Sequence, residues 1–406
     1  MICPENLKKL AIFVLIVIIS AMDINDLKNF IQSANINFLI GSGLSTPYLT
    51  TLKNIEKHLE VLETKIDLDS KVRELIKASI LKEYFSKVMI PNETIYDQSK
   101  YNEVLDNYKR FISVWNSIMH NRCGNLRSKQ VNVFSTNIDM FFERAADSSG
   151  VEFVDGFQGS ITPIFSEVNF QKIVMRNSLH FHNVTELPVF NLLKIHGSVN
   201  WRVDKGKIVN DSKLEQVATI ATLLNDLELM YSFVTYDNSL DNMVSEAKKI
   251  VEREDYDHKG VEEFVEKYKE LVIVNPTKKK FSATVIDDHF YELMRMYSNA
   301  LERENTLLFV MGFSFADEHI LSITQRALKT NPTLLVVIYA YDETAYSSYE
   351  KKFGKTPNVK ILSNIMYAAD DKSKENPING KYDFKAIIEQ HKEVRKLIPL
   401  TFEHVK

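Results

Sequence analysis

Six short runs of almost continuous apolar residues stand out along the chain, each with the length of a single β-strand. They are rich in β-branched residues and lack the alternation of polar and apolar positions typical of a strand with one wet face. This pattern predicts strands buried on both faces, at residues 36–40, 131–134, 189–195, 306–311, 333–339 and 359–362. Helical stretches separate the runs, so we expect a doubly wound parallel sheet of the Rossmann-like α/β class.

Two longer stretches interrupt this alternation with amphipathic helical patterns. One spans residues 49–126, where apolar residues such as Tyr108, Phe111 and Trp115 recur at helical spacing, and the other spans residues 211–301. We interpret both as helical insertions that form a cap or small domain beside the sheet. The predicted core then consists of residues 22–48, 127–210 and 302–365, and residues 366–406 form a C-terminal loop and helix.

Residues 1–21 form an apolar N-terminal segment that fits three interpretations. Lys8 and Lys9 precede an apolar run at residues 10–19, which is far shorter than the roughly 20 residues needed to span a bilayer. The segment is a gene-model extension before a start at Met22, a secretory signal peptide, or a packed helix. We expect the rest of the chain to be cytoplasmic and to have no membrane partner.

The charge and the cysteine content exclude two classes of ligand. The chain has 50 basic and 54 acidic side chains and a net charge of −4 at pH 7, whereas proteins dedicated to duplex nucleic acid carry a basic surplus. We therefore expect no direct binding of nucleic acid. The 2 cysteines, Cys3 and Cys123, are too few for a zinc site with four cysteine ligands, and we expect no other metal.

A glycine-containing turn directly follows the first apolar run. Gly41, Ser42, Gly43 and Ser45 stand where a strand would turn into a helix, and backbone N–H groups at such a turn can face a pyrophosphate. The glycines allow a close approach because they have no Cβ. The alternative is a tight turn without a ligand, since Thr46 replaces the third glycine of the dinucleotide-binding fingerprint.

Polar residues also follow the second and third apolar runs. Thr136, Asn137 and Asp139 follow the second run, and His196 follows the third. Amide and carboxylate groups at the carboxyl end of a strand face the ligand crevice of a doubly wound sheet, and histidine can act as a base near pH 7. The alternatives are a helix cap for the Asn and Asp, and a structural role for a histidine beside Gly197.

A fourth polar turn follows the run at residues 306–311. Gly312 and Ser314 would face a ligand there, whereas Asp317 also fits a helix cap. Each of the four turns alone is a modest signal. Together they fall at strand ends on the same edge of one sheet, which is where doubly wound folds bind their ligands.

In this order, the motifs Gly-Ser-Gly-x-Ser, Ser-Thr-Asn-x-Asp, Lys-x-His-Gly-Ser and Gly-Phe-Ser resemble those of the sirtuin fold, which binds NAD. The resemblance covers roughly residues 35–345 and leaves both insertions unmatched. Deacylating sirtuins carry a four-cysteine zinc module and an Asp-Phe-Arg segment after the glycine turn, where this chain has Thr46-Pro47-Tyr48-Leu49. The chain is therefore more similar to the sirtuin-like NAD hydrolases of bacterial anti-phage defence. Its length and architecture resemble the subunit that assembles with a HerA-type ring ATPase.

This resemblance implies roles for individual residues. Asn137 would position a water molecule beside the anomeric carbon, Asp139 would help to bind the nicotinamide carboxamide or the nearby ribose, and His196 would act as general base on the ribose hydroxyls. Asp342 would reach the adenine ribose, with simple surface exposure as the alternative. Further contacts with NAD are expected from Gly41, Ser42, Gly43, Ser45, Thr136, Gly312 and Ser314.

The implied function is hydrolysis of NAD to nicotinamide and ADP-ribose, which depletes NAD during infection and requires no metal. Two alternatives remain open. One is an NAD-dependent protein deacylase or ADP-ribosyltransferase, and the other is a non-catalytic sensor of NAD or ADP-ribose. Because an NAD-depleting enzyme must be silent at rest, we expect a homo-oligomer or a gate controlled by a partner such as a HerA-type ATPase.

Overall fold

The computed structural model describes residues 24–51, 55–64, 68–122, 127–180, 182–226, 239–274, 285–354, 356–363 and 381–399. The apolar segment at residues 1–21 lies outside these ranges, so its three interpretations are unchanged. None of the described helices combines the length and the apolar character needed to cross a bilayer.

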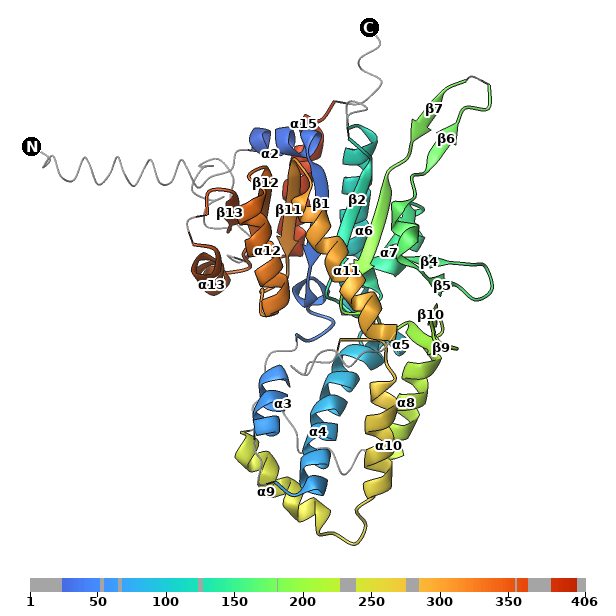
Figure 1. The fold of residues 1–406 in the computed structure, drawn as a ribbon, viewed down its shortest axis with the longest axis vertical. Helices are drawn as coiled ribbons and strands as arrows, with labels where there is room; N and C mark the ends of the chain where they lie inside the picture. Colours follow the sequence, from blue (N-terminus) through green and yellow to red (C-terminus); the bar gives the residue numbers. More distant parts are fainter. Residues whose placement is uncertain are drawn as a thin grey trace, which may run out of the picture.

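Seven parallel strands form the central sheet (Figure 1). Their order across the sheet is β13 (Val359–Leu362), β12 (Leu334–Tyr339), β11 (Thr306–Met311), β1 (Asn35–Ile40), β2 (Gln130–Ser135), β8 (Val189–Lys194) and β3 (Glu152–Val154). The strand order reverses between β1 and β11, because the chain builds one side of the sheet outward from β1 before it returns to β11. The predicted Rossmann-like α/β class is confirmed, and all six predicted strands belong to this sheet.

Helices cover both faces of the sheet, which is why its strands are apolar on both sides. Phe38 of β1 packs against Phe111 and Trp115, with ring centroids 5.1 and 4.8 Å apart. On the opposite face, Phe134 of β2 lies 5.0 Å from Tyr297. The first face is covered by α2 (Ile24–Ser33), α6 (Gln98–His120), α7 (Phe141–Ser149) and α15 (Phe384–Leu397), and the second by α11 (Val285–Glu302), α12 (Glu318–Thr330) and α13 (Glu343–Phe353).

The two predicted insertions contribute to a single helical lobe beside the sheet (Figure 1). Helices α6 and α11 fall within the ranges 49–126 and 211–301 assigned to the insertions, yet they pack on the sheet. An amphipathic pattern shows that a helix buries one face but not which surface that face meets. The lobe consists of α3 (Ile55–Thr64), α4 (Ser70–Tyr84), the π-helical turn η2 (Phe85–Met89), α5 (Ile90–Glu93), α8 (Glu215–Asp226), α9 (Leu240–Val251) and α10 (His258–Lys269).

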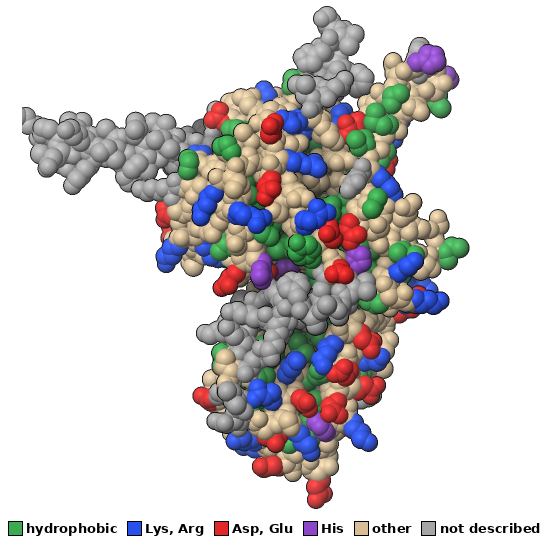
Figure 2. All heavy atoms as spheres, viewed as in Figure 1, with side chains coloured by type: hydrophobic (Ala, Val, Ile, Leu, Met, Phe, Trp, Pro, Cys, Tyr) green, Lys and Arg blue, Asp and Glu red, His purple; other side chains and the backbone are tan. Residues whose placement is uncertain are grey.

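Short antiparallel strands, which no pattern in the sequence predicts, form two small sheets beside the central one, and only the four-stranded sheet lies next to the helical lobe (Figure 1). Two hairpin ends project from the body, and their apolar residues Ile161 and Leu179 are 96% and 94% exposed (Figures 1 and 2). A strand of two to four residues is too short for a period-two pattern to be recognised. One sheet has the order β4 (Phe157–Gln158), β5 (Ile164–Phe165), β10 (Lys207–Asn210) and β9 (Trp201–Asp204), and the other pairs β6 (Met175–Asn177) with β7 (Val184–Glu186).

His391 of α15 is fully buried in the core, between α6 and β12. Its Nδ1 accepts a hydrogen bond from the Trp115 indole N–H at 3.1 Å, and its Nε2 lies 2.9 Å from the Tyr339 hydroxyl. Burial lowers the pKa of His391 from 6.5 to about 3. The folded protein therefore holds this imidazole neutral, and protonation favours the unfolded chain.

Folding stability is expected to fall as the pH drops below about 6.5, because the unfolded chain protonates His391 while the folded protein does not. The free energy of unfolding should lose up to about 1.4 kcal/mol per pH unit from this residue, down to its folded pKa of about 3. Urea unfolding at pH 7.0 and 5.5 checks this, with His391→Gln showing a weaker pH dependence and His120→Gln, at an exposed position, behaving like wild type. Equal slopes for wild type and His391→Gln would contradict the assignment.

Candidate active site

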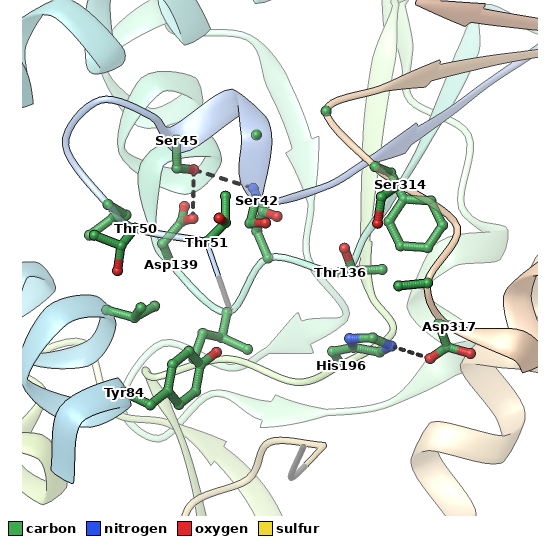
Figure 3. Close-up of a pocket in the computed structure, with 18 of the residues that line it drawn as sticks. Ser42, Ser45, Thr50, Thr51, Tyr84, Thr136, Asp139, His196, Ser314 and Asp317 are labelled. Atoms are coloured by element: carbon green, nitrogen blue, oxygen red, sulfur yellow. Dashed lines mark hydrogen bonds and ion pairs between the residues drawn. The ribbon is translucent and has the colours of Figure 1, made fainter. Parts of the chain in front are cut away.

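A cavity of about 370 Å³ lies at the carboxyl ends of β1, β2, β8 and β11, beside the helical lobe (Figure 3). This is the edge at which the strand order reverses, where doubly wound folds bind their ligands. Tyr84 at the end of α4 and Val88 in the following turn line the cavity from the lobe. Nine of the eleven predicted site residues also line it, namely Ser42, Gly43, Ser45, Thr136, Asn137, Asp139, His196, Gly312 and Ser314.

The glycines of the first turn bring two strand-end turns into contact. A Cβ on Gly41 would lie 2.5 Å from the carbonyl oxygen of Gly312, and a Cβ on Gly43 would lie 2.9 Å from the Gly312 Cα. The N–H groups of Gly41 and Gly43 donate to the carbonyls of Met311 and Gly312, each at 3.0 Å. The chain then makes only a single 3-10 turn, η1 (Ser42–Ser45), in place of the predicted helix. Fewer backbone N–H groups are thus free to face a pyrophosphate than the sequence indicated.

A chain of hydrogen bonds fixes the side-chain amide of Asn137. The Ser45 hydroxyl donates to Asp139 Oδ2 at 2.7 Å. Asn137 Nδ2 donates in turn to Ser45 Oγ and to the Tyr108 hydroxyl oxygen, each at 3.3 Å. Asn137 Oδ1 is left as a buried acceptor with no hydrogen-bond partner among the described residues. Asn137 is among the residues that line the cavity, and a buried acceptor without a partner is a candidate position for a bound water molecule or a substrate hydroxyl.

Asp139 supports this arrangement from within the protein. Its Oδ2 accepts from Ser45 and its Oδ1 accepts the Phe141 N–H at 3.1 Å. Burial, and next the charge of Asp139, raise the pKa of Tyr108 well above its ordinary value, so the Tyr108 hydroxyl is protonated at neutral pH. The carboxylate of Asp139 thus orients Asn137 through Ser45, while its predicted contact with nicotinamide remains a prediction.

Lys194, at the end of β8, joins the turn that carries Asp139 to the turn that carries His196. Its side chain is buried, and Nζ donates to Glu143 Oε1 at 2.8 Å, to Ser198 Oγ at 2.7 Å and to the carbonyl oxygen of Asp139. Burial raises the pKa of Glu143, and the ion pair with Lys194 opposes that rise. A charged residue at the end of an apolar strand was the only sign of this network in the sequence.

Replacing Lys194 by Met is expected to lower the free energy of unfolding by about 3–5 kcal/mol, because Glu143 then remains buried without its cation. The double variant Lys194→Met with Glu143→Leu should recover most of this loss, since it removes both charges. Urea unfolding of wild type, the single variant and the double variant checks the prediction. A loss below about 1 kcal/mol for the single variant would show that the ion pair is not stabilising the native state as its burial implies.

His196 lies at the lower edge of the cavity, and Figure 3 shows it pointing toward Asp317. The distance from His196 Nε2 to Asp317 Oδ2 is 3.2 Å. The carbonyl oxygen of His196 accepts the Val274 N–H at 2.9 Å, which fixes the backbone on the other side. Gly197 follows with a φ of +76°, a left-handed conformation that favours glycine.

The sequence indicated Asp317 as a helix cap but gave no sign of its contact with His196. Both interactions are present, because Asp317 Oδ1 accepts the N–H groups of His319 and Ile320 at the start of α12. Asp342 is not among the residues that line the cavity. Its carboxylate caps α13 by accepting the Ala345 N–H at 2.8 Å, so its predicted contact with the adenine ribose remains a prediction.

A group that could hold a metal ion lies away from the cavity. Among the described residues, Glu74 of α4 and His258 and Glu262 of α10 place potential ligand atoms within 4.8 Å of one another. All three belong to the helical lobe, and none lines the cavity. The described residues of the cavity itself offer hydroxyl, amide, carboxylate and imidazole groups, a set suited to binding a polar organic substrate.

Comparison with known protein families gives a match to the SIR2-like domain. The SIR2-like domain matches residues 131–362, which is more than half of the chain and includes Asn137, Asp139 and His196. The glycine turn at residues 41–45 precedes the matched range. A search of curated proteins found no match. The chain therefore belongs to the SIR2-like family, whose members are enzymes that use NAD as a substrate.

Proposed function

We propose that this protein hydrolyses NAD at the bond between nicotinamide and ribose, giving nicotinamide and ADP-ribose. The observation that carries the proposal is the pairing of two groups in one cavity. Asn137 has an amide whose orientation is fixed and whose Oδ1 has no partner among the described residues, and His196 lines the same cavity. These groups suit a reaction in which a water molecule is positioned and a proton is accepted.

In the proposed reaction, the bond from the anomeric carbon to the nicotinamide nitrogen breaks and nicotinamide leaves with the electron pair. Water adds to the anomeric carbon and one proton is released, so that atoms and charge balance. Asn137 Oδ1 would accept a hydrogen bond from the attacking water and hold its lone pair toward the carbon. His196 would accept hydrogen bonds or a proton from the ribose hydroxyls, which stabilises the positive charge that develops on the ring.

Two features favour water over a protein acceptor. The chain has 2 cysteines, so the four-cysteine zinc module of deacylating sirtuins has no counterpart in it. Tyr84 and Val88 line the cavity from the helical lobe, and we expect the lobe to leave less room for a lysine peptide. The deacylase or ADP-ribosyltransferase function is therefore the weaker alternative.

The test is release of nicotinamide and ADP-ribose from NAD, followed by HPLC for wild type, His196→Ala and His120→Ala. Wild type should release nicotinamide and ADP-ribose in equal amounts. His120→Ala, which changes an exposed histidine, should do so at the wild-type rate. His196→Ala should be slower by about 10²- to 10⁴-fold, the usual contribution of a general base. If wild type binds NAD in calorimetry but releases neither product, alone or as an assembly purified from its host, the protein is a sensor and not a hydrolase.

The proposal extends to anti-phage defence, in which NAD depletion arrests the infected cell, and to assembly as a homo-oligomer with a HerA-type ATPase. Ile161 and Leu179, at the ends of two projecting hairpins, are 96% and 94% exposed, and we propose them as contact points in such an assembly. On the face shown in Figure 2, basic and acidic side chains are interspersed, unlike the basic surfaces that bind nucleic acid. Light scattering of wild type and of Ile161→Asp with Leu179→Asp tests the assembly, and NAD levels in infected cells test the defence role.

A further inference from the structure

The contact between His196 and Asp317 constrains how the imidazole can act, and this inference rests on the proposed function. The 3.2 Å distance joins His196 Nε2 to Asp317 Oδ2, and the two side chains are 23% and 12% exposed. Figure 3 shows the other ring nitrogen, on the opposite side from Asp317, turned toward the cavity below Thr136. One nitrogen of the ring is therefore occupied by a carboxylate, and the other faces the space for a substrate.

Asp317 is itself held in place. Its Oδ1 accepts the N–H groups of His319 at 2.9 Å and Ile320 at 3.2 Å, so the carboxylate is the N-cap of α12. The positive end of the helix dipole also favours the charged form of a carboxylate at this position. Because one oxygen is committed to the helix, the other is presented to His196 in a fixed direction.

We propose that Asp317 is a positioning residue that keeps the proton of the neutral His196 imidazole on Nε2, and so presents the Nδ1 lone pair to the ribose hydroxyls. A neutral imidazole carries one N–H, and its other nitrogen is an acceptor. With the proton on Nε2, that N–H faces the carboxylate oxygen at 3.2 Å. With the proton on Nδ1, two lone pairs would face each other and the base would have none for the substrate.

The backbone supports the same ring orientation. The His196 carbonyl oxygen accepts the Val274 N–H at 2.9 Å, and the Gly197 N–H donates to the Lys194 carbonyl oxygen at 3.0 Å. The backbone on both sides of the His196 side chain is thus fixed. One further contact, to the imidazole itself, is then enough to fix the orientation of the ring. Asp317 supplies that contact from a different strand end, after β11.

The decisive variant is Asp317→Asn. Asparagine is as good an N-cap as aspartate, so α12 should remain intact. Its amide N–H group, turned toward His196, would favour the lone pair on Nε2 and the proton on Nδ1. We expect kcat for NAD hydrolysis to fall by about as much as in His196→Ala, about 10²- to 10⁴-fold, because the base is present but its lone pair faces away from the substrate, with a much smaller change in KM.

The matched control is Asp383→Asn, the same change at the N-cap of α15, which is not among the residues lining the cavity. It should leave kcat within about twofold of wild type, while thermal unfolding should show both variants folded. Wild-type-like kcat in Asp317→Asn, measured beside an inactive His196→Ala, would overturn the inference and leave the hydrolase intact.

A spectroscopic measurement separates the inference from the proposed function. In protein labelled with ¹⁵N-histidine, proton–nitrogen correlation spectra identify which ring nitrogen carries the proton, and His196→Gln assigns the signal. Wild type should carry the proton on Nε2 and Asp317→Asn on Nδ1. A proton on Nδ1 in wild type would overturn the inference whether or not NAD is cleaved. An Nε2 proton with no turnover in any assay would uphold the positioning role and contradict the hydrolase.

Discussion

Replacing Asn137 by Ala is expected to lower the turnover of NAD by at least about a hundredfold, the effect of losing the group that aligns one reactant. The variant removes the Oδ1 acceptor proposed to hold the attacking water. It also removes the Nδ2 donor, whose loss leaves Ser45 and Tyr108 to bond with each other at 3.3 Å. The chemical step should suffer far more than NAD binding, so kcat falls while KM changes little. Steady-state kinetics with HPLC detection measures both.

Asn132→Ala is the matched control for this prediction. Asn132 lies in β2, the strand that precedes the Asn137 turn, and it joins neighbouring strands by accepting from Asn191 at 3.0 Å and donating to Asn37 at 2.9 Å. Its loss should reduce the free energy of unfolding by about 1–3 kcal/mol, because buried partners are left without bonds, yet kcat should stay near the wild-type value. Equal kcat losses in the two variants would mean that Asn137 acts through folding and not through the reaction.

Replacing Gly197 by Ala is expected to destabilise the fold and to lower turnover at the same time. The residue has a φ of +76°, and an added Cβ would lie 2.0 Å from the Val272 carbonyl oxygen and 3.0 Å from the Ile273 Cα. These are backbone atoms, so the clash can be relieved only by separating the His196 turn from residues 272–274. We expect a loss of roughly 2–5 kcal/mol, from the left-handed conformation and the overpacking together. Urea unfolding and NAD turnover measure the two effects.

Gly206→Ala is the matched control, because it carries the conformational cost of a positive φ without the clash. Gly206 has nearly the same φ, +75°, but nothing lies within 4 Å of the position of its Cβ. This variant should lose only about 1–2 kcal/mol, the conformational cost alone, and should keep its activity. If Gly197→Ala were no worse than Gly206→Ala in either measurement, the tight contact between the His196 turn and residues 272–274 would not be required for function.

The sheet and most of the cavity could be predicted because both depend on local patterns. A strand buried on both faces is an unbroken apolar run, as in β11 (Thr306–Met311) and β12 (Leu334–Tyr339), and polar residues directly after such runs fall at one sheet edge. Asn137 and His196 were found in this way, and both line the cavity.

The remaining features depend on contacts between distant segments. Tyr108 lies on an amphipathic helix, where its apolar ring predicts only burial, and its hydrogen bond to Asn137 follows from how α6 packs on the sheet. Asp317 satisfies the pattern of an N-cap completely, so its second interaction, with His196, leaves no local trace. The surface that α6 and α11 cover was missed for the same reason, since a helical period does not identify the partner of its apolar face.

The most direct test of the central claim is the hydrolysis of NAD in water enriched in ¹⁸O, with the ADP-ribose product analysed by mass spectrometry. If water is the acceptor, ADP-ribose must gain one ¹⁸O atom during turnover, and Asn137→Ala must form it at least about a hundredfold more slowly. The reaction must be stopped early, because the anomeric hydroxyl of ADP-ribose also exchanges its oxygen with water. A parallel sample of ADP-ribose without enzyme, kept in the same water for the same time, measures that exchange. Nicotinamide release with ADP-ribose attached to protein, or with an acyl group attached to the ribose, would contradict the hydrolase and identify a transferase.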